Sequence, residues 1–203
     1  MYTVFVTGPL ASGKRTACLY LAQQGFSHID LDAVAKEFLD DELVQAQLVE
    51  AYGTAICESS GTINRAQLAE AAFAGEGSSD ALNGIIWPLV GARLSDLIVG
   101  NSCQLDRSEE RLVVEIPMLA EAPEMLDLAD VVVGITADRG IRIERALERG
   151  MKLDDVLGRM SLQASDEERA EICDIVIENN GSLDQLYKKL DTWLASANQE
   201  QLF

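Results

Sequence analysis

The sequence predicts an α/β fold of three layers, in which a parallel sheet of about five strands lies between helices on both faces. Two patterns indicate this class. Short apolar runs of strand length recur along the chain, and helical patterns separate one run from the next. Apolar residues make up 48% of the 203 residues, which is enough for one domain with a substantial core. In such a sheet, ligands bind at the carboxyl ends of the strands.

Five apolar runs are expected to form the strands. They are Thr3–Thr7, Phe26–Asp30, Arg111–Ile116, Asp130–Thr136 and Asp174–Glu178. The helical patterns that separate them cover Gly13–Gln24, Leu89–Val99, Gly140–Arg149 and Leu183–Ala197, the last of these after a Ser182 cap.

The interval between the second and third strands is too long for one crossover helix. It carries helical stretches over Ala33–Tyr52, Arg65–Ala74 and Ser79–Val99. We therefore predict a chain of three parts. They are a core of residues 1–32, 100–137 and 164–203, a helical insertion of residues 33–99, and a lid of residues 138–163.

A glycine-rich turn joins the first strand to the first helix. It reads Gly8-Pro9-Leu10-Ala11-Ser12-Gly13-Lys14-Arg15, and Thr16 follows it. The order of strand, glycine loop and helix is typical of a phosphate-binding loop, whose backbone N–H groups surround an anion at the positive end of the helix. Lys14 is expected to reach the outer phosphates as a point charge. The whole run from Gly8 to Thr16 is expected to line the phosphate site.

The last position of this loop departs from the usual pattern. Arg15 stands where a Ser or Thr hydroxyl ordinarily ligates Mg²⁺. Thr16 lies about 100° further round the helix, so it cannot simply take over that role. Three outcomes stay open: water completes the magnesium shell, Arg15 contacts the β-phosphate, or nucleotide binds without turnover. Which residues of the chain would ligate the metal stays unknown.

A second basic group lies in the predicted lid. Of the 16 Lys and Arg residues, six lie between Arg139 and Arg159. Arg145 and Arg149 are four residues apart and share a helix face, and Arg159 comes from the second half of the lid. Closure of the lid would bring these planar donors to phosphate oxygens. The alternative is a solvated helix, because glutamates lie among the arginines.

Carboxylates follow two of the predicted strands. Asp32 follows the second strand, from where it can meet a hydroxyl group that faces the γ-phosphate, so it is the candidate base. The alternative is that Asp32 caps a helix beginning at Ala33. Asp30 is either the neighbour of that cap or a contact of magnesium-bound water. Glu115 is either an acid for the metal or an ordinary carboxylate at a strand end.

The charge and the cysteines exclude several classes of protein. The net charge of -18 argues against a nucleic-acid or anionic-membrane surface. The four cysteines form no C-x-x-C pair, and with the single His28 they predict no zinc site, so isolated thiols in a reducing compartment are expected. The chain opens on a strand rather than a leader, and no apolar stretch approaches membrane-spanning length. A soluble cytoplasmic protein is therefore expected.

Six segments, in order, resemble the signature motifs of the dephospho-coenzyme A kinases, a family of P-loop kinases. The resemblance covers nearly the whole chain, and the ordered set is far more specific than the loop alone. The segments are Thr7–Lys14 for T-G-G-I-G-S-G-K, Ile29–Ala35 for I-D-A-D-x-I-A, Gly61–Ala69 for G-x-L-D-R-x-x-L-A, Glu115–Glu121 for D-I-P-L-L-F-E, Arg159–Gln163 for R-I-A-A-Q, and Asp174–Gly181 for D-x-V-I-D-N-x-G.

This resemblance implies a three-layer P-loop kinase fold with a helical coenzyme A-binding region and an arginine lid. It implies transfer of the γ-phosphate of ATP, with Mg²⁺, to the ribose 3′-hydroxyl of dephospho-coenzyme A, giving coenzyme A and ADP. The partner is thus a small molecule, with no role for nucleic acid or membrane. The oligomeric state is not predicted.

The residues expected at the site fall into three groups. The catalytic group is Asp32, Lys14 and Arg149. The substrate group is Asp32, Arg65, Pro88 and Arg159. The nucleotide group is the run Gly8–Thr16 with Arg145, Asn179 and Gly181, the last two near the adenine.

Four positions depart from the family pattern. Besides Arg15, Trp87 stands in place of a His before Pro88, Gly150 replaces an Asp, and Ala11 replaces a loop glycine. Ala11 is strained if its position needs a positive φ. Two other functions stay open: a P-loop kinase with another small-molecule acceptor, and a non-catalytic nucleotide-binding module.

Overall fold

The computed structural model describes residues 2–72, 74, 77–103, 111–117 and 119–199. Its contacts divide the chain into two compact units. The first combines Met1–Asp30 with Asn101–Phe203, and the second is Leu31–Gly100. Residues 138–163, expected as a lid, fall within the first unit, and the division into core, insertion and lid stays a prediction.

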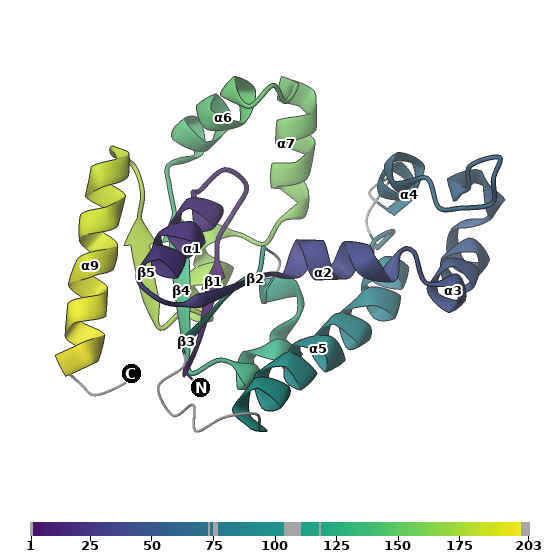
Figure 1. Ribbon diagram of the computed structural model, residues 1–203. Helices are drawn as coiled ribbons and strands as arrows, with labels where there is room; N and C mark the ends of the chain where they lie inside the picture. Colours follow the sequence, from purple (N-terminus) through teal and green to yellow (C-terminus); the bar gives the residue numbers. More distant parts are fainter. Residues whose placement is uncertain (1, 73, 75–76, 104–110, 118, 200–203) are drawn as a thin grey trace. The chain divides into compact units, whose positions relative to one another are not determined.

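The first unit contains a five-stranded parallel sheet with the order β2-β3-β1-β4-β5 (Figure 1). The strands are β1 (Tyr2–Thr7), β2 (Ser27–Asp30), β3 (Arg111–Glu115), β4 (Val131–Thr136) and β5 (Ile175–Glu178). Every strand that the sequence predicts is present, and each observed boundary lies within one residue of the expected one. The α/β prediction is therefore confirmed.

The central strands are buried because both sides of each strand carry apolar residues. Val4, Phe5 and Val6 of β1 are each fully buried. One face of the sheet packs against α1 (Lys14–Gln23) and α9 (Leu183–Gln199) through a cluster that includes Leu21 and Leu190. Burial of such side chains stabilises each by about 1.5–3 kcal/mol, which fixes the helix on which the glycine loop ends.

Three further helices follow β4 in the same unit. They are α6 (Arg139–Glu148), α7 (Leu153–Leu162) and α8 (Asp166–Glu171). Ser165 caps α8 with a capping box, in which its hydroxyl accepts from Glu168 N and the Glu168 carboxylate accepts from Ser165 N. The remaining short elements are the 3₁₀ helices η2 (Leu119–Glu121) and η3 (Pro123–Leu128).

The second unit is helical. It consists of α2 (Leu31–Phe38), α3 (Glu42–Tyr52), the 3₁₀ helix η1 (Thr54–Ile56), α4 (Arg65–Ala72) and most of α5 (Asp80–Cys103). The sequence predicts one helical stretch over Ala33–Tyr52, but the structure breaks it at Asp41. The Asp41 carboxylate accepts from Leu43 N at 2.8 Å and Val44 N at 3.2 Å, so it caps a new helix instead of continuing the first.

One expectation about apolar length is wrong. Asp80–Val99 of α5 is long and apolar enough to cross a membrane by length and composition, although the sequence analysis expected no such stretch. One helix of this kind is weak support for a membrane span, because core helices pass the same test. Its Pro88 and Gly84 interrupt the apolar pattern without ending the helix.

The thiol of Cys173 is expected to make stability fall at high pH. Burial, with the neighbouring Asp174 charge, raises the pKa of this thiol from 9.0 to about 11. Between these values the unfolded chain releases the proton while the folded chain keeps it, so the free energy of unfolding decreases as pH rises. Cys173→Ser is expected to flatten this decrease, measured by urea unfolding at about pH 8 and about pH 10. Cys57→Ser, in the other unit, is the control; equal slopes in both variants would contradict the assignment.

Candidate active site

The glycine loop between β1 and α1 has an unusual backbone. Gly8 has φ 151°, Ala11 has φ 60° and Gly13 has φ 107°. Ala11 is the one residue other than glycine with a positive φ in the described part of the chain. The strain expected from the sequence at Ala11 is therefore present, at a cost of about 1–2 kcal/mol. A strained, closely packed loop of this kind is typical of ligand-binding sites.

Two loop glycines are required because other chain segments lie directly against them. A Cβ atom on Gly8 would collide with the backbone carbonyl of Ile135 in β4. A Cβ atom on Gly13 would collide with the side chain of Asn179, whose Nδ2 donates to Ser12 O at 2.7 Å. Asn179 is buried, and its side chain holds the loop in place through this hydrogen bond. Its expected place near an adenine stays a prediction.

Lys14 and two hydroxyl groups of the loop region form the polar part of the site. Lys14 is buried, and its Nζ donates to Gly8 O at 2.6 Å and to Pro9 O at 3.0 Å. The hydroxyls of Thr7 and Ser12 are buried without a hydrogen-bond partner among the described residues. Buried hydroxyls are ordinarily satisfied, so both groups are available to donate to a ligand.

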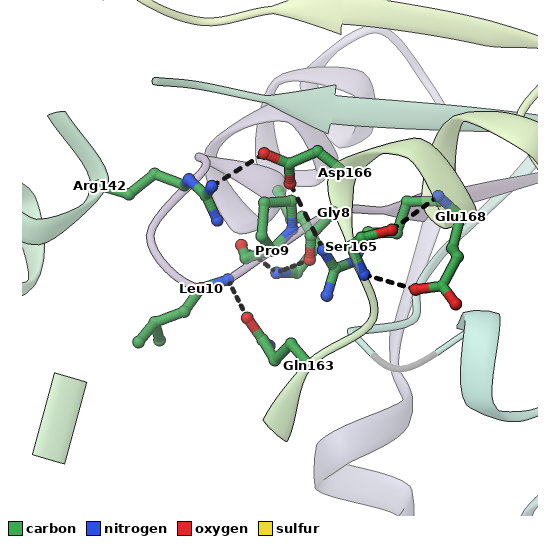
Figure 2. A network of polar contacts seen from close by, with 10 residues as sticks. Gly8, Pro9, Leu10, Arg142, Gln163, Ser165, Asp166 and Glu168 are labelled. Carbon is green, nitrogen blue, oxygen red and sulfur yellow. Dashed lines mark hydrogen bonds and ion pairs between the residues drawn. The ribbon is translucent and has the colours of Figure 1, made fainter. Parts of the chain in front are cut away.

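The loop contacts the segment that leaves α7. Leu10 N of the loop donates to Gln163 Oε1 at 3.0 Å, and Figure 2 shows Gln163 next to Leu10. In the same view Arg142 of α6 reaches Asp166 of α8, with 3.0 Å between Nη2 and the carboxylate. Arg142 is buried, so its ion pair joins α6 to α8 rather than facing solvent.

The other arginines of this region have different surroundings. Arg145 is half-buried and its Nη2 donates to Gly181 O at 3.5 Å. Arg149 directly follows α6 as its C-cap, and both Arg149 and Arg159 are exposed. The alternative prediction of a solvated helix is therefore wrong for Arg142, which is buried. Arg149 and Arg159 are exposed and accessible to a ligand.

Arg15 lies in an ion pair that the sequence analysis missed. Its Nη1 donates to Asp30 Oδ2 at 2.8 Å, and its side chain is 66% exposed. Asp30 ends β2 and lies in register with Glu115 at the end of β3. Nothing in the sequence indicates this pair, because Arg15 lies in α1 after β1, Asp30 ends β2, and β3 separates these two strands in the sheet. The Arg15 guanidinium therefore lies at the edge of the sheet where the sequence predicts only carboxylates.

Three expected residues lie in the second unit. Asp32 is in the first turn of α2, because that helix begins at Leu31 and not at Ala33; Asp32 is therefore not its N-cap. Arg65 begins α4 and pairs with Asp40, with 3.3 Å between Nη2 and Oδ2. Pro88 of α5 lines a cavity of about 470 Å³ whose other walls come from α3 and α5.

Comparisons with known proteins show the family to which the chain is similar. A sequence model of the dephospho-CoA kinase family matches residues 2–185. The dephospho-CoA kinase of Fusobacterium nucleatum is 31% identical over 188 residues, which cover 92% of this chain and 93% of that protein.

Solved structures show the same fold. A crystal structure from Thermus thermophilus is 26% identical, with a TM-score of 0.76 over 96% of this chain and 97% of that one. The dephospho-CoA kinase from Campylobacter jejuni is 22% identical, with a TM-score of 0.68 over 98% of each chain. The expected P-loop kinase fold is thus confirmed. By its glycine loop, its parallel sheet and a family match along most of its length, the chain belongs to the dephospho-CoA kinase family.

Proposed function

We propose that this protein transfers the γ-phosphate of ATP to the ribose 3′-hydroxyl of dephospho-coenzyme A, giving coenzyme A and ADP. The observation that carries this proposal is the strained loop with Lys14 and the unpartnered buried hydroxyl of Ser12, in a chain of this family. The protein acts on small molecules, since its charge of -18 disfavours nucleic acid and anionic membranes, and we place it in the cytoplasm.

The loop binds the triphosphate. Apart from Pro9, which has no N–H, the residues of the loop from Gly8 to Thr16 donate backbone N–H groups to phosphate oxygens, and the start of α1 adds its positive end. Lys14 exchanges its bonds to Gly8 O and Pro9 O for bonds to the outer phosphates. We assign the free hydroxyl of Ser12 to the same anion.

Asp32 accepts the proton of the attacking 3′-hydroxyl. The new bond joins that oxygen to the γ-phosphorus, and the bond from the γ-phosphorus to the β,γ-bridging oxygen breaks, so ADP leaves with the electron pair. Arg149 and Arg145 neutralise charge on the transferred group, as planar donors to its oxygens. Because the chemistry is mainly positioning and neutralisation, no covalent enzyme intermediate is required.

The acceptor is bound by residues of the second unit and the α7 region. Arg65 and Arg159 are exposed guanidinium groups suited to the phosphates of dephospho-coenzyme A. The cavity lined by Pro88 provides apolar walls within the second unit. We place Asn179 and Gly181 near the adenine of ATP.

Magnesium supplies charge neutralisation for the transferred phosphate when it is bound. The usual loop hydroxyl ligand is absent, because Arg15 replaces it. Phosphate oxygens and water would therefore hold most of the ion, which suits Mg²⁺ because it keeps several waters. Asp30 is the carboxylate of this chain that we assign to those waters, and Arg15 moderates its charge.

A direct assay tests the function. Purified protein is incubated with MgATP and dephospho-coenzyme A, and coenzyme A is detected by its mass while ADP is measured by a coupled reaction. We expect equal amounts of the two products. ADP formation only with another nucleoside or alcohol would instead identify a kinase with a different acceptor. Binding of ATP without any product at high protein concentration would identify a non-catalytic module.

Arg15→Ser is expected to tighten magnesium binding. The change removes a cation next to Asp30 and restores the hydroxyl that ordinarily ligates the ion. We expect the Mg²⁺ concentration for half-maximal activity to fall by about tenfold, which corresponds to roughly 1.4 kcal/mol. The measurement is a magnesium titration at fixed ATP. Arg15→Lys keeps the charge and is the control. If the titration curve of Arg15→Ser matches those of the wild type and of Arg15→Lys, Arg15 does not influence the magnesium site.

A further inference from the structure

Three potential metal ligands that are distant in the sequence meet beneath the first turns of α1. They are Cys18 of α1, His28 of β2 and Glu115 of β3, all in the first unit. One ligand atom from each lies within 4.8 Å of the other two. His28 is the single histidine of the chain. The sequence predicts no zinc site, because the cysteines form no C-x-x-C pair and the chain has a single histidine. This reasoning does not cover ligands that three separate elements bring together.

The strand register explains how the three residues meet. His28 and Asp30 are two residues apart in β2 and point to the same face of the sheet, and Glu115 lies opposite Asp30. That face packs against α1, whose buried residues include Ala17, Cys18 and Leu21. The cluster is therefore enclosed between the sheet and the helix.

The cluster is buried and its polar atoms are not satisfied. Cys18 is fully buried and Glu115 is 7% exposed. His28 Nε2 and Glu115 Oε2 lie 3.7 Å apart, too far for a hydrogen bond, and neither atom has a hydrogen-bond partner among the described residues. A buried carboxylate oxygen without a partner costs several kcal/mol or more, so this arrangement needs a compensating group.

We propose that Cys18, His28 and Glu115 bind a zinc ion. Sulfur, imidazole nitrogen and carboxylate oxygen are the three donor types of tetrahedral zinc sites, with bonds of about 2.0–2.3 Å. A nitrogen and an oxygen ligand at the corners of such a tetrahedron are roughly 3.3–3.5 Å apart, and the separation of 3.7 Å between His28 Nε2 and Glu115 Oε2 needs only a small side-chain shift to reach that distance. Water takes the fourth position.

The charge balance also favours zinc in a buried place. On binding, the Cys18 thiol releases its proton to solvent, so one thiolate and one carboxylate offset the two positive charges of the ion. A thiolate ligand favours zinc over magnesium, which prefers oxygen ligands only. In the metal-free protein, burial and the Glu115 charge raise the pKa of the Cys18 thiol, so it is protonated and unreactive.

Such an ion would join three elements that position the glycine loop. Cys18 lies one helical turn after Lys14, His28 lies two residues before Asp30, and Glu115 is in register with Asp30. The zinc ion is therefore structural, and it adds to the proposed kinase function without taking part in phosphate transfer. Its presence is testable whether or not the protein turns over dephospho-coenzyme A.

Metal binding by the whole chain tests the proposal. The purified protein is stripped with a chelator, then titrated with Zn²⁺ and separately with Co²⁺. We expect one equivalent of either ion, a higher melting temperature with zinc, and a sulfur-to-cobalt charge-transfer absorption that reports the thiolate. A folded wild-type protein that binds no zinc at equimolar concentration, or binds cobalt without that absorption, would overturn the site.

Variants identify the ligands. Cys18→Ser and His28→Gln are each expected to weaken zinc affinity by roughly 100-fold or more, because loss of even an outer partner costs 10–100-fold. Cys57→Ser and Cys173→Ser are the matched controls and should bind as the wild type does. Wild-type affinity in a folded Cys18→Ser protein would refute the assignment. If that variant does not fold, the cobalt spectrum of the wild type still decides the question.

Discussion

Lys14→Met is expected to lower kcat/KM for ATP by about 10²–10³-fold. In the proposed site this ammonium is the one cation of the loop interior, and the outer phosphates carry charge that increases in the transition state. Methionine keeps the length of the side chain but offers no charge and no donor. The measurement is steady-state kinetics with dephospho-coenzyme A held at saturation, together with nucleotide binding by calorimetry.

A structural effect of this change must be separated from a catalytic one. Lys14 Nζ also binds two carbonyl oxygens of its own loop, so the variant loses those bonds as well. The melting temperature of Lys14→Met is therefore compared with that of Lys188→Met, which alters an exposed lysine of α9. A folded Lys14→Met protein with unchanged kcat/KM would exclude Lys14 from phosphate binding.

The sheet could be predicted from the sequence because its signal is local. Runs such as Val4–Val6 and Val131–Val133 are apolar on both sides of the strand, as a parallel sheet covered by helices requires. The glycine loop was equally clear, since strand, glycines and lysine occur in one short segment. Even the strain at Ala11 followed from the requirement of the loop for a positive φ.

The break between α2 and α3 could not be predicted in the same way. Asp41 is compatible with a helix interior by periodicity, but its carboxylate accepts from two N–H groups at the start of α3, which a continuous helix would bond to backbone carbonyls instead. The helix start at Leu31 was also missed, because Asp30 and Asp32 are both suitable caps.

Contacts between residues that are distant in the chain could not be predicted from the sequence. The Arg15–Asp30 pair needs α1 and β2 to lie side by side, and the cluster of Cys18, His28 and Glu115 needs a third element. Neither the spacing of these residues nor their type indicates the contact. Only the strand order, which places β3 between β1 and β2, brings them together.

Asp32→Asn is expected to lower kcat by about 10²–10⁴-fold while ATP affinity stays unchanged. The amide has nearly the shape of the carboxylate but cannot accept the proton of the 3′-hydroxyl at neutral pH. Loss of the base should also remove the acidic limb of the kcat–pH profile, which a merely structural change would leave in place.

Glu37→Gln provides the matched control for this variant, since it removes one negative charge from an exposed position of the same helix. We expect kcat of Glu37→Gln to remain within about twofold of the wild type, because isolated exposed charges contribute little. If Asp32→Asn turns over as fast as Glu37→Gln, then Asp32 is not the base, and positioning and charge neutralisation by the loop and the arginines must carry the reaction alone. If instead kcat falls and the acidic limb disappears, the proton of the acceptor passes to this carboxylate.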